Sequence, residues 1–97
     1  MWLDRYHIRY HYKGMSKTEK LLAAARNNPA NVRFSDLVRL LSKAGFLHDR
    51  TRGSHQIWIH ASRAEVPALN VQDKDGMAKR YQVEQFLMIL DEYNVEV

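Results

Sequence analysis

Five histidines are the side chains of this 97-residue chain that best suit proton transfer near neutral pH. The chain has no cysteine, which excludes a cysteine nucleophile, a thiolate zinc site and a disulfide framework. It also lacks the Walker phosphate loop and the glycine motif of dinucleotide-binding proteins. The candidates for proton transfer are His7, His11, His48, His55 and His60.

His55 differs from the other histidines in its sequence context. It follows Gly53 and Ser54, which form an expected turn, and it begins the clearest strand pattern in the chain. Because glycine has no Cβ, the backbone at such a turn can approach a ligand closely. We therefore expect Gly53 and Ser54 to support a site around His55.

A basic stretch precedes His55 and suggests what that site would do. RNA supplies its own nucleophile, the ribose 2′-hydroxyl, so cleavage without a metal needs a proton-transfer group and cations that stabilise the phosphate charge. His55 suits the first role, as acid, base or both, and the second role suits Lys43, Arg50 and Arg52. A lone strand histidine is more often structural, so the pattern alone leaves both interpretations open.

The remaining histidines give weaker signals. His60 lies five residues after His55, and side chains alternate along a strand, so the two should face opposite sides and not act as an acid–base pair. His7 and His11 have the spacing of half a helical metal site, but no third ligand follows at ligand spacing, and we expect no metal site. His48 is either an exposed strand histidine or a neighbour of bound phosphate.

Charge and hydropathy limit the function classes. The formal net charge is +4, and two of these charges lie in residues 1–14, so global charge argues only weakly for nucleic acid. No apolar stretch approaches the length of a transmembrane helix, and residues 1–14 lack the apolar core of a signal peptide. We expect a cytoplasmic protein without a membrane partner or a small-molecule cofactor.

Three helices are expected to position these residues. Residues 16–19 spell a capping box, S-x-x-E, and begin a helix that ends before Pro29. Ser35 is the expected N-cap of a second helix, which ends at Gly45 because glycine readily adopts positive φ. Residues 79–93 form the last amphipathic helix.

Three strands are expected between the second and the last helix. Residues 46–52 and 55–61 form a hairpin around Gly53 and Ser54, and residues 66–71 form the third strand. Residues 73–76, D-K-D-G, are expected to be a solvated turn and not a catalytic carboxylate pair. The order α-α-β-β-β-α predicts an α+β fold, with a three-stranded antiparallel sheet and helices on one face.

The central strand carries apolar residues on both faces. Ile57 and Ile59 share the face of His55, whereas Trp58 lies on the other face, so the pattern does not decide which face meets the helices. Trp58 is expected in the core, because a tryptophan on a central strand usually packs there. The alternative is a platform on which an RNA base stacks.

Residues 15–97 are expected to form a single domain. Residues 1–14 form an arm of interleaved aromatic, basic and histidine residues without a regular period. One interpretation is that the arm has little order or precedes a true start at Met15. The other is that it grips single-stranded RNA by stacking and charge.

The motif Gly53-Ser54-His55, followed by two further residues and then Trp58, resembles the HicA family of bacterial toxins. The upstream residues 35–46, which end in glycine and phenylalanine, and the later residues 81–87 also resemble that family, so the resemblance spans roughly residues 34–95. It implies a fold like that of double-stranded-RNA-binding domains. It also implies a metal-independent endoribonuclease of a type II toxin–antitoxin system that degrades mRNA, with His55 as the catalytic histidine and a HicB-like antitoxin as partner.

The chain departs from the family pattern in three places. The family often has His-Pro after the central strand, a histidine on the third strand and a Gly-Thr-Leu-like start to the last helix. Here these places hold His60-Ala61, residues 67–70 without a histidine, and residues 78–81, A-K-R-Y. Two alternatives to the ribonuclease stay open: a non-catalytic RNA-binding module, in which His55 is replaceable, and a pure protein-interaction domain without RNA affinity.

Overall fold

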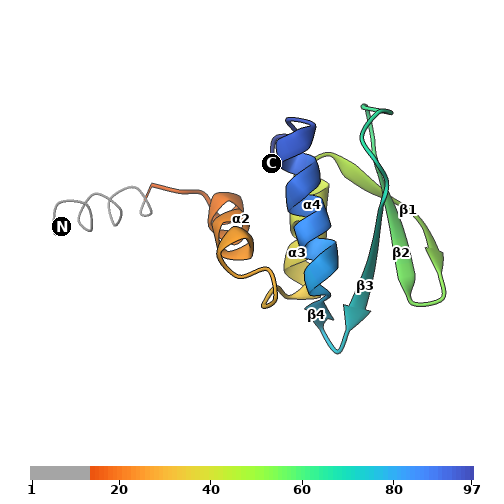
Figure 1. The fold of residues 1–97 in the computed structure, drawn as a ribbon, viewed down its shortest axis with the longest axis horizontal. Helices are drawn as coiled ribbons and strands as arrows, with labels where there is room; N and C mark the ends of the chain where they lie inside the picture. The colour runs from red at the N-terminus through yellow and green to blue at the C-terminus, as the bar shows by residue number, and fades with distance from the viewer. Residues whose placement is uncertain (1–13) are drawn as a thin grey trace, which may run out of the picture.

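The structure, a computed structural model, describes residues 14–97 and has the predicted α+β fold (Figure 1). The predictions for the arm, His7 and His11 included, lie outside the described residues. The helices are α2 (Lys17–Asn27), α3 (Phe34–Lys43) and α4 (Arg80–Glu92). The strands are β1 (Phe46–Arg52), β2 (His55–His60), β3 (Leu69–Lys74) and β4 (Met77–Ala78).

Within residues 14–97 the sheet is antiparallel, in the order β1-β2-β3-β4, and has four strands, so the prediction of three strands was wrong. The fourth strand arises because Asp75 and Gly76 both have positive φ, 53° and 85°, and close a two-residue hairpin. The predicted turn at residues 73–76 is therefore shorter. The third strand begins later than predicted and extends to Lys74; Pro67 precedes it, because proline has no N–H to give to the ladder.

The start of α3 also differs from the prediction. Ser35 is not the N-cap; Arg33 is, and it makes no side-chain cap hydrogen bond. Instead, the backbone N–H of Phe34 donates to the carbonyl of Gly76 at 2.9 Å. Pairing with the β3–β4 hairpin thus decides where this helix begins, and that contact is invisible to a local capping rule.

In the described part of the chain, one face of the sheet is covered by helices and the other is not. α3 and α4 lie on the same side of it (Figure 1), and they pack on a core that includes Trp58, Leu69 and Val71. Trp58 is only 6% exposed, so its predicted core position is confirmed. The other face, which we call the open face, carries His55, Ile57 and Ile59 and points away from the helices.

None of the helices within residues 14–97 has the length and apolar character that crossing a membrane requires.

Candidate active site on the open face of the sheet

A β-bulge in β1 determines which side chains of that strand lie on the same face of the sheet as His55. The pairing of β1 with β2 skips Asp49, between His48 and Arg50. In a regular strand Arg50 and Arg52 would point to the same side as His48, towards the helices. The extra residue reverses the alternation, so both arginines lie on the open face with His55.

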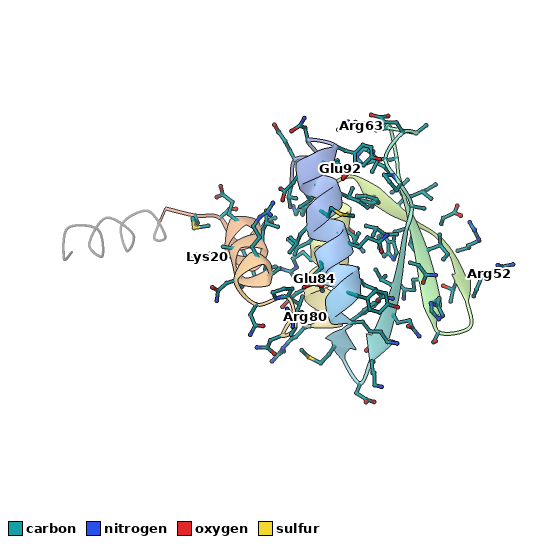
Figure 2. The ribbon with its side chains drawn as sticks, in the orientation of Figure 1. Lys20, Arg52, Arg63, Arg80, Glu84 and Glu92 are labelled. Atoms are coloured by element: carbon teal, nitrogen blue, oxygen red, sulfur yellow. The ribbon has the colours of Figure 1, made fainter. Side chains whose placement is uncertain are left out.

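Arg52 is the closest cationic neighbour of His55 in the register, because the two residues lie directly opposite each other on β1 and β2. Figure 2 shows Arg52 at the outer end of this hairpin, away from the helices. Arg52 forms no ion pair within residues 14–97, whereas the Arg50 guanidinium contacts the Asp49 carboxylate. Arg52 therefore offers the less neutralised charge.

Within residues 14–97, His55 makes one side-chain hydrogen bond, and its partner was not among the predicted site residues. Its Nδ1 lies 2.7 Å from Oδ1 of Asn70 on β3. An amide oxygen only accepts, so Nδ1 must carry the hydrogen in this bond. Nε2, the other ring nitrogen, has no hydrogen-bond partner in the described part of the chain. We call Arg50, Arg52, His55 and Asn70 the open-face site.

The turn beside the site is held by a second side chain of β3. Gln72 donates from Nε2 to the Ser54 hydroxyl oxygen at 3.0 Å, and its backbone N–H donates to the side-chain oxygen of Gln82 at 2.8 Å. Gln82 is a residue of α4 and is 1% exposed. β3 is thus attached to α4 on one side and to the turn at Gly53 and Ser54 on the other, where Gly53 has a φ of 61°.

Lys43 is not part of this group. It is the last residue of α3 and precedes β1, whereas Arg52 and His55 lie at the far end of the β1–β2 hairpin. Phe46 and Arg52, the two ends of β1, are separated by roughly 20 Å at the usual rise of an extended strand. The structure therefore separates the predicted phosphate-binding lysine from the two predicted arginines.

His48 lies on the opposite side of the sheet from His55. Its ring stacks on that of Trp58, with centroids 5.3 Å apart and an interplanar angle of 15°. Its Nε2 is 2.9 Å from the Thr51 hydroxyl oxygen. His48 therefore covers the core tryptophan and does not reach the arginines of the open face.

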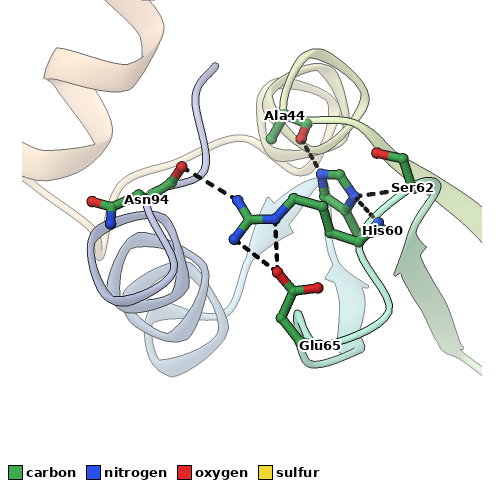
Figure 3. A network of polar contacts seen from close by, with 6 residues as sticks. Ala44, His60, Ser62, Glu65 and Asn94 are labelled. Carbon is green, nitrogen blue, oxygen red and sulfur yellow. Dashed lines mark hydrogen bonds and ion pairs between the residues drawn. The ribbon is translucent and has the colours of Figure 1, made fainter.

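His60 is a structural residue, and its predicted orientation away from His55 is confirmed by the strand register. Its Nε2 donates to the carbonyl of Ala44 at 3.1 Å, and its Nδ1 accepts the backbone N–H groups of Ser62 and Arg63 (Figure 3). Both ring nitrogens are thus occupied. His60 ties the end of α3 to the segment that follows β2.

The same network continues from Arg63. Its guanidinium donates to the Glu65 carboxylate at 2.9 Å and to the carbonyl of Asn94 at 3.4 Å (Figure 3). Hydrogen bonds from its own backbone and from Arg63 lower the pKa of Glu65 below its ordinary value. This end of the sheet is tied to the chain after α4 and is distinct from the open-face site.

Asn70 and Gln72 were not among the predicted site residues, because residues 67–70 were compared with the family pattern only for a histidine. Their placement follows from the register of β3, where Leu69 and Val71 are fully buried and the residues after each of them face the open side. Correct strand boundaries would have revealed this alternation. Among the described residues, no group of three or more histidines, aspartates and glutamates is placed to hold a metal ion.

A comparison with known protein families matches residues 34–88 to the family described as the HicA toxin of bacterial toxin–antitoxin systems. The matched segment spans more than half of the chain and contains all four residues of the open-face site. Comparisons with curated proteins and with solved structures found no match.

Proposed function

The chain belongs to the HicA toxin family, and from this premise we propose that it is a toxin that cleaves mRNA in the cytoplasm, with His55 as its catalytic residue. Membership of a toxin–antitoxin family implies an antitoxin partner. The observation that carries the proposal is the open-face site itself. It combines an imidazole whose Nε2 has no hydrogen-bond partner among residues 14–97 with a directly opposed arginine that forms no ion pair there.

The proposed reaction is a transesterification that needs only these groups and the RNA. Neutral His55 takes the proton of the ribose 2′-hydroxyl, and the 2′-oxygen attacks the adjacent phosphorus. The bond from phosphorus to the 5′-oxygen breaks, and that oxygen receives a proton from the protonated histidine or from water. The products are a 2′,3′-cyclic phosphate and a 5′-hydroxyl, and the reaction requires no metal.

The arginines are proposed to bind the reacting phosphate. A guanidinium can donate two parallel hydrogen bonds to phosphate oxygens and stabilise the charge that grows on them. Arg52 is the first candidate, because it lies opposite His55 and forms no ion pair within residues 14–97. Arg50 is the second, since Asp49 neutralises part of its charge. Gly53 and Ser54 support the turn between the strands, and Lys43 lies too far away to contact the same phosphate.

A HicB-like antitoxin is proposed to cover the open face. Leu47 and Ile59 lie opposite each other on this face and are 57% and 39% exposed. Apolar side chains of this size beside a charged site offer the kind of surface that protein partners bury. We expect complex formation to abolish cleavage; cutting that persists in the saturated complex would count against this arrangement.

The proposal is tested by incubating the purified chain with mixed-sequence RNA in EDTA and measuring cleavage and binding across salt concentrations. The variants are Arg52→Ala and Lys43→Ala, each of which removes one positive charge. For Arg52→Ala we expect slower cleavage and a salt slope of log affinity that is smaller by roughly 0.7, the value for one phosphate contact on a single strand. Lys43→Ala should retain the parent cleavage rate.

The outcomes separate three functions. Cleavage that depends on Arg52 but not on Lys43 supports the ribonuclease. Salt-dependent binding without cleavage supports a non-catalytic RNA-binding module. A chain that neither binds nor cuts RNA at any salt concentration is a protein-interaction domain, and the proposed function is then wrong.

A further inference from the structure

We propose that Asn70 is a positioning residue, which holds the His55 ring with its proton on Nδ1 and thereby makes Nε2 the atom that exchanges a proton with RNA. This inference rests on the proposed function for its catalytic consequence, but the state of the ring can be measured without any reaction. Asn70 itself touches no reacting atom in this scheme.

The hydrogen bond between the two side chains determines the tautomer. Oδ1 of Asn70 lies 2.7 Å from Nδ1 of His55, and a carbonyl oxygen has no hydrogen to give. In a neutral imidazole only one nitrogen carries a hydrogen, so Nε2 of His55 holds a lone pair. That nitrogen is therefore the one available to accept the proton of a 2′-hydroxyl.

Asn70 is well placed to hold the ring because β3 itself is fixed. The residues on either side, Leu69 and Val71, are 0% exposed and belong to the core. Two residues further on, the backbone of Gln72 is bound by the buried side chain of Gln82. An exposed amide on such a strand has little freedom to shift, so its oxygen can select one orientation of the imidazole.

The same contact fixes which edge of the ring faces the arginine side. Nδ1 of His55 is turned towards β3, on one side of β2, while Arg52 lies opposite on β1, on the other side. Without the amide, the ring could turn over or exchange its tautomer, and either change would remove the Nε2 lone pair from the site. Loss of Asn70 should therefore lower the rate constant and leave RNA binding intact.

The first test reads the tautomer directly by ¹⁵N NMR of the histidine ring in the parent, Asn70→Ala, Asn70→Asp and Asn31→Ala, at a pH where the ring is neutral. We expect the proton on Nδ1 in the parent. Asn70→Asp should keep it there, because a carboxylate also accepts. Asn70→Ala should lose this preference, and Asn31→Ala, which removes an exposed asparagine in the connection between α2 and α3, should not. An unchanged tautomer in Asn70→Ala overturns the proposal.

The second test measures cleavage as a function of pH. We expect Asn70→Ala to lower kcat about tenfold, equivalent to ~1.4 kcal/mol, with KM little changed. Asn70→Asp should recover most of the rate and move the acid limb of the profile to higher pH, because a neighbouring carboxylate favours the protonated ring. A merely structural role would give no such pH shift, so an unmoved profile in Asn70→Asp contradicts the positioning role.

The two proposals fail in different ways. If the parent cuts no RNA but its ring shows the proton on Nδ1 only when Asn70 is present, the ribonuclease is wrong and the positioning of the ring stands. If the parent cuts RNA and Asn70→Ala cuts equally fast, the ribonuclease stands and the positioning role is wrong.

Discussion

Substitution of Gly45 by alanine should destabilise the fold far more than the same change at Gly53. Gly45 joins α3 to β1 and has a φ of 94°, whereas Gly53 has a φ of 61°. The left-handed region that other residues occupy is narrow, roughly +50° to +70°. Gly53 lies inside that region and Gly45 lies outside it, so only Gly45→Ala forces the backbone to a conformation that alanine strongly disfavours.

The space around the two glycines also differs. A Cβ on Gly45 would lie 2.8 Å from Nε2 and 3.2 Å from Cε1 of His60, whereas a Cβ on Gly53 would meet no atom within 4 Å. The His60 ring would have to move and lose its 3.1 Å hydrogen bond to Ala44. Backbone strain of about 1–3 kcal/mol and a lost hydrogen bond of about 1 kcal/mol give a total of about 2–4 kcal/mol. For Gly53→Ala we expect about 1 kcal/mol.

Urea unfolding followed by circular dichroism measures these losses. With a slope of about 1–2 kcal/mol per molar urea, a loss of ~3 kcal/mol lowers the midpoint by roughly 2 M. A double-mutant cycle separates the two causes. In a His60→Ala background the clash is gone, so the cost of Gly45→Ala should fall by about 1 kcal/mol.

Equal shifts of the midpoint by Gly45→Ala and Gly53→Ala would show that neither strain nor the His60 contact distinguishes the two glycines. If Gly45→Ala is the more destabilising but costs the same with and without His60, the strain argument holds and the steric argument is wrong.

Two further predictions concern the contacts of α4. Gln82→Leu should lower the free energy of unfolding by about 1–2 kcal/mol, because the N–H of Gln72 loses its acceptor, while the exposed Gln85→Leu on the same helix should change it little. The hydrogen bond from Arg26 lowers the pKa of Asp91 below its ordinary value, so this carboxylate stabilises the fold above about pH 4, and the contribution disappears as the pH falls through the lowered pKa. The difference in unfolding free energy between the parent and Asp91→Asn should therefore be present at neutral pH and shrink on acidification, and a difference that is independent of pH would exclude this ion pair as its cause.

Local patterns predicted the elements that carry the candidate site. The hairpin of β1 and β2 around Gly53, the capping box of α2 and the positive φ of Gly45 all follow from residues close in sequence. Each depends on the intrinsic conformational preference of one or two residues, and that preference follows directly from the residue type. The opposite orientation of His55 and His60 follows equally simply from alternation along one strand.

The features that the sequence did not reveal depend on pairing between distant segments. Strict alternation would have turned Arg50 and Arg52 towards the helices, and only the bulge at Asp49 brings them to the open face. The start of α3 is determined by a hydrogen bond to Gly76, more than forty residues later. The position of Asn70 beside His55 follows only from the register of β3 against β2.

The separation of Lys43 from the arginines has the same origin. In the sequence all three lie within ten residues of each other, but a seven-residue strand places them at opposite ends of the hairpin. Proximity in sequence is a poor guide along an extended strand, because each residue adds about 3.3 Å.

The most direct test of the central claim is the rate of cleavage of a mixed-sequence RNA in EDTA by the parent, His55→Ala and His48→Ala, with equal folding verified by circular dichroism. His48 is the matched control, because it is a strand histidine on the opposite face of the same hairpin. We expect the parent and His48→Ala to cut the RNA and His55→Ala to leave it intact. Equal cleavage by the parent and His55→Ala would contradict this expectation.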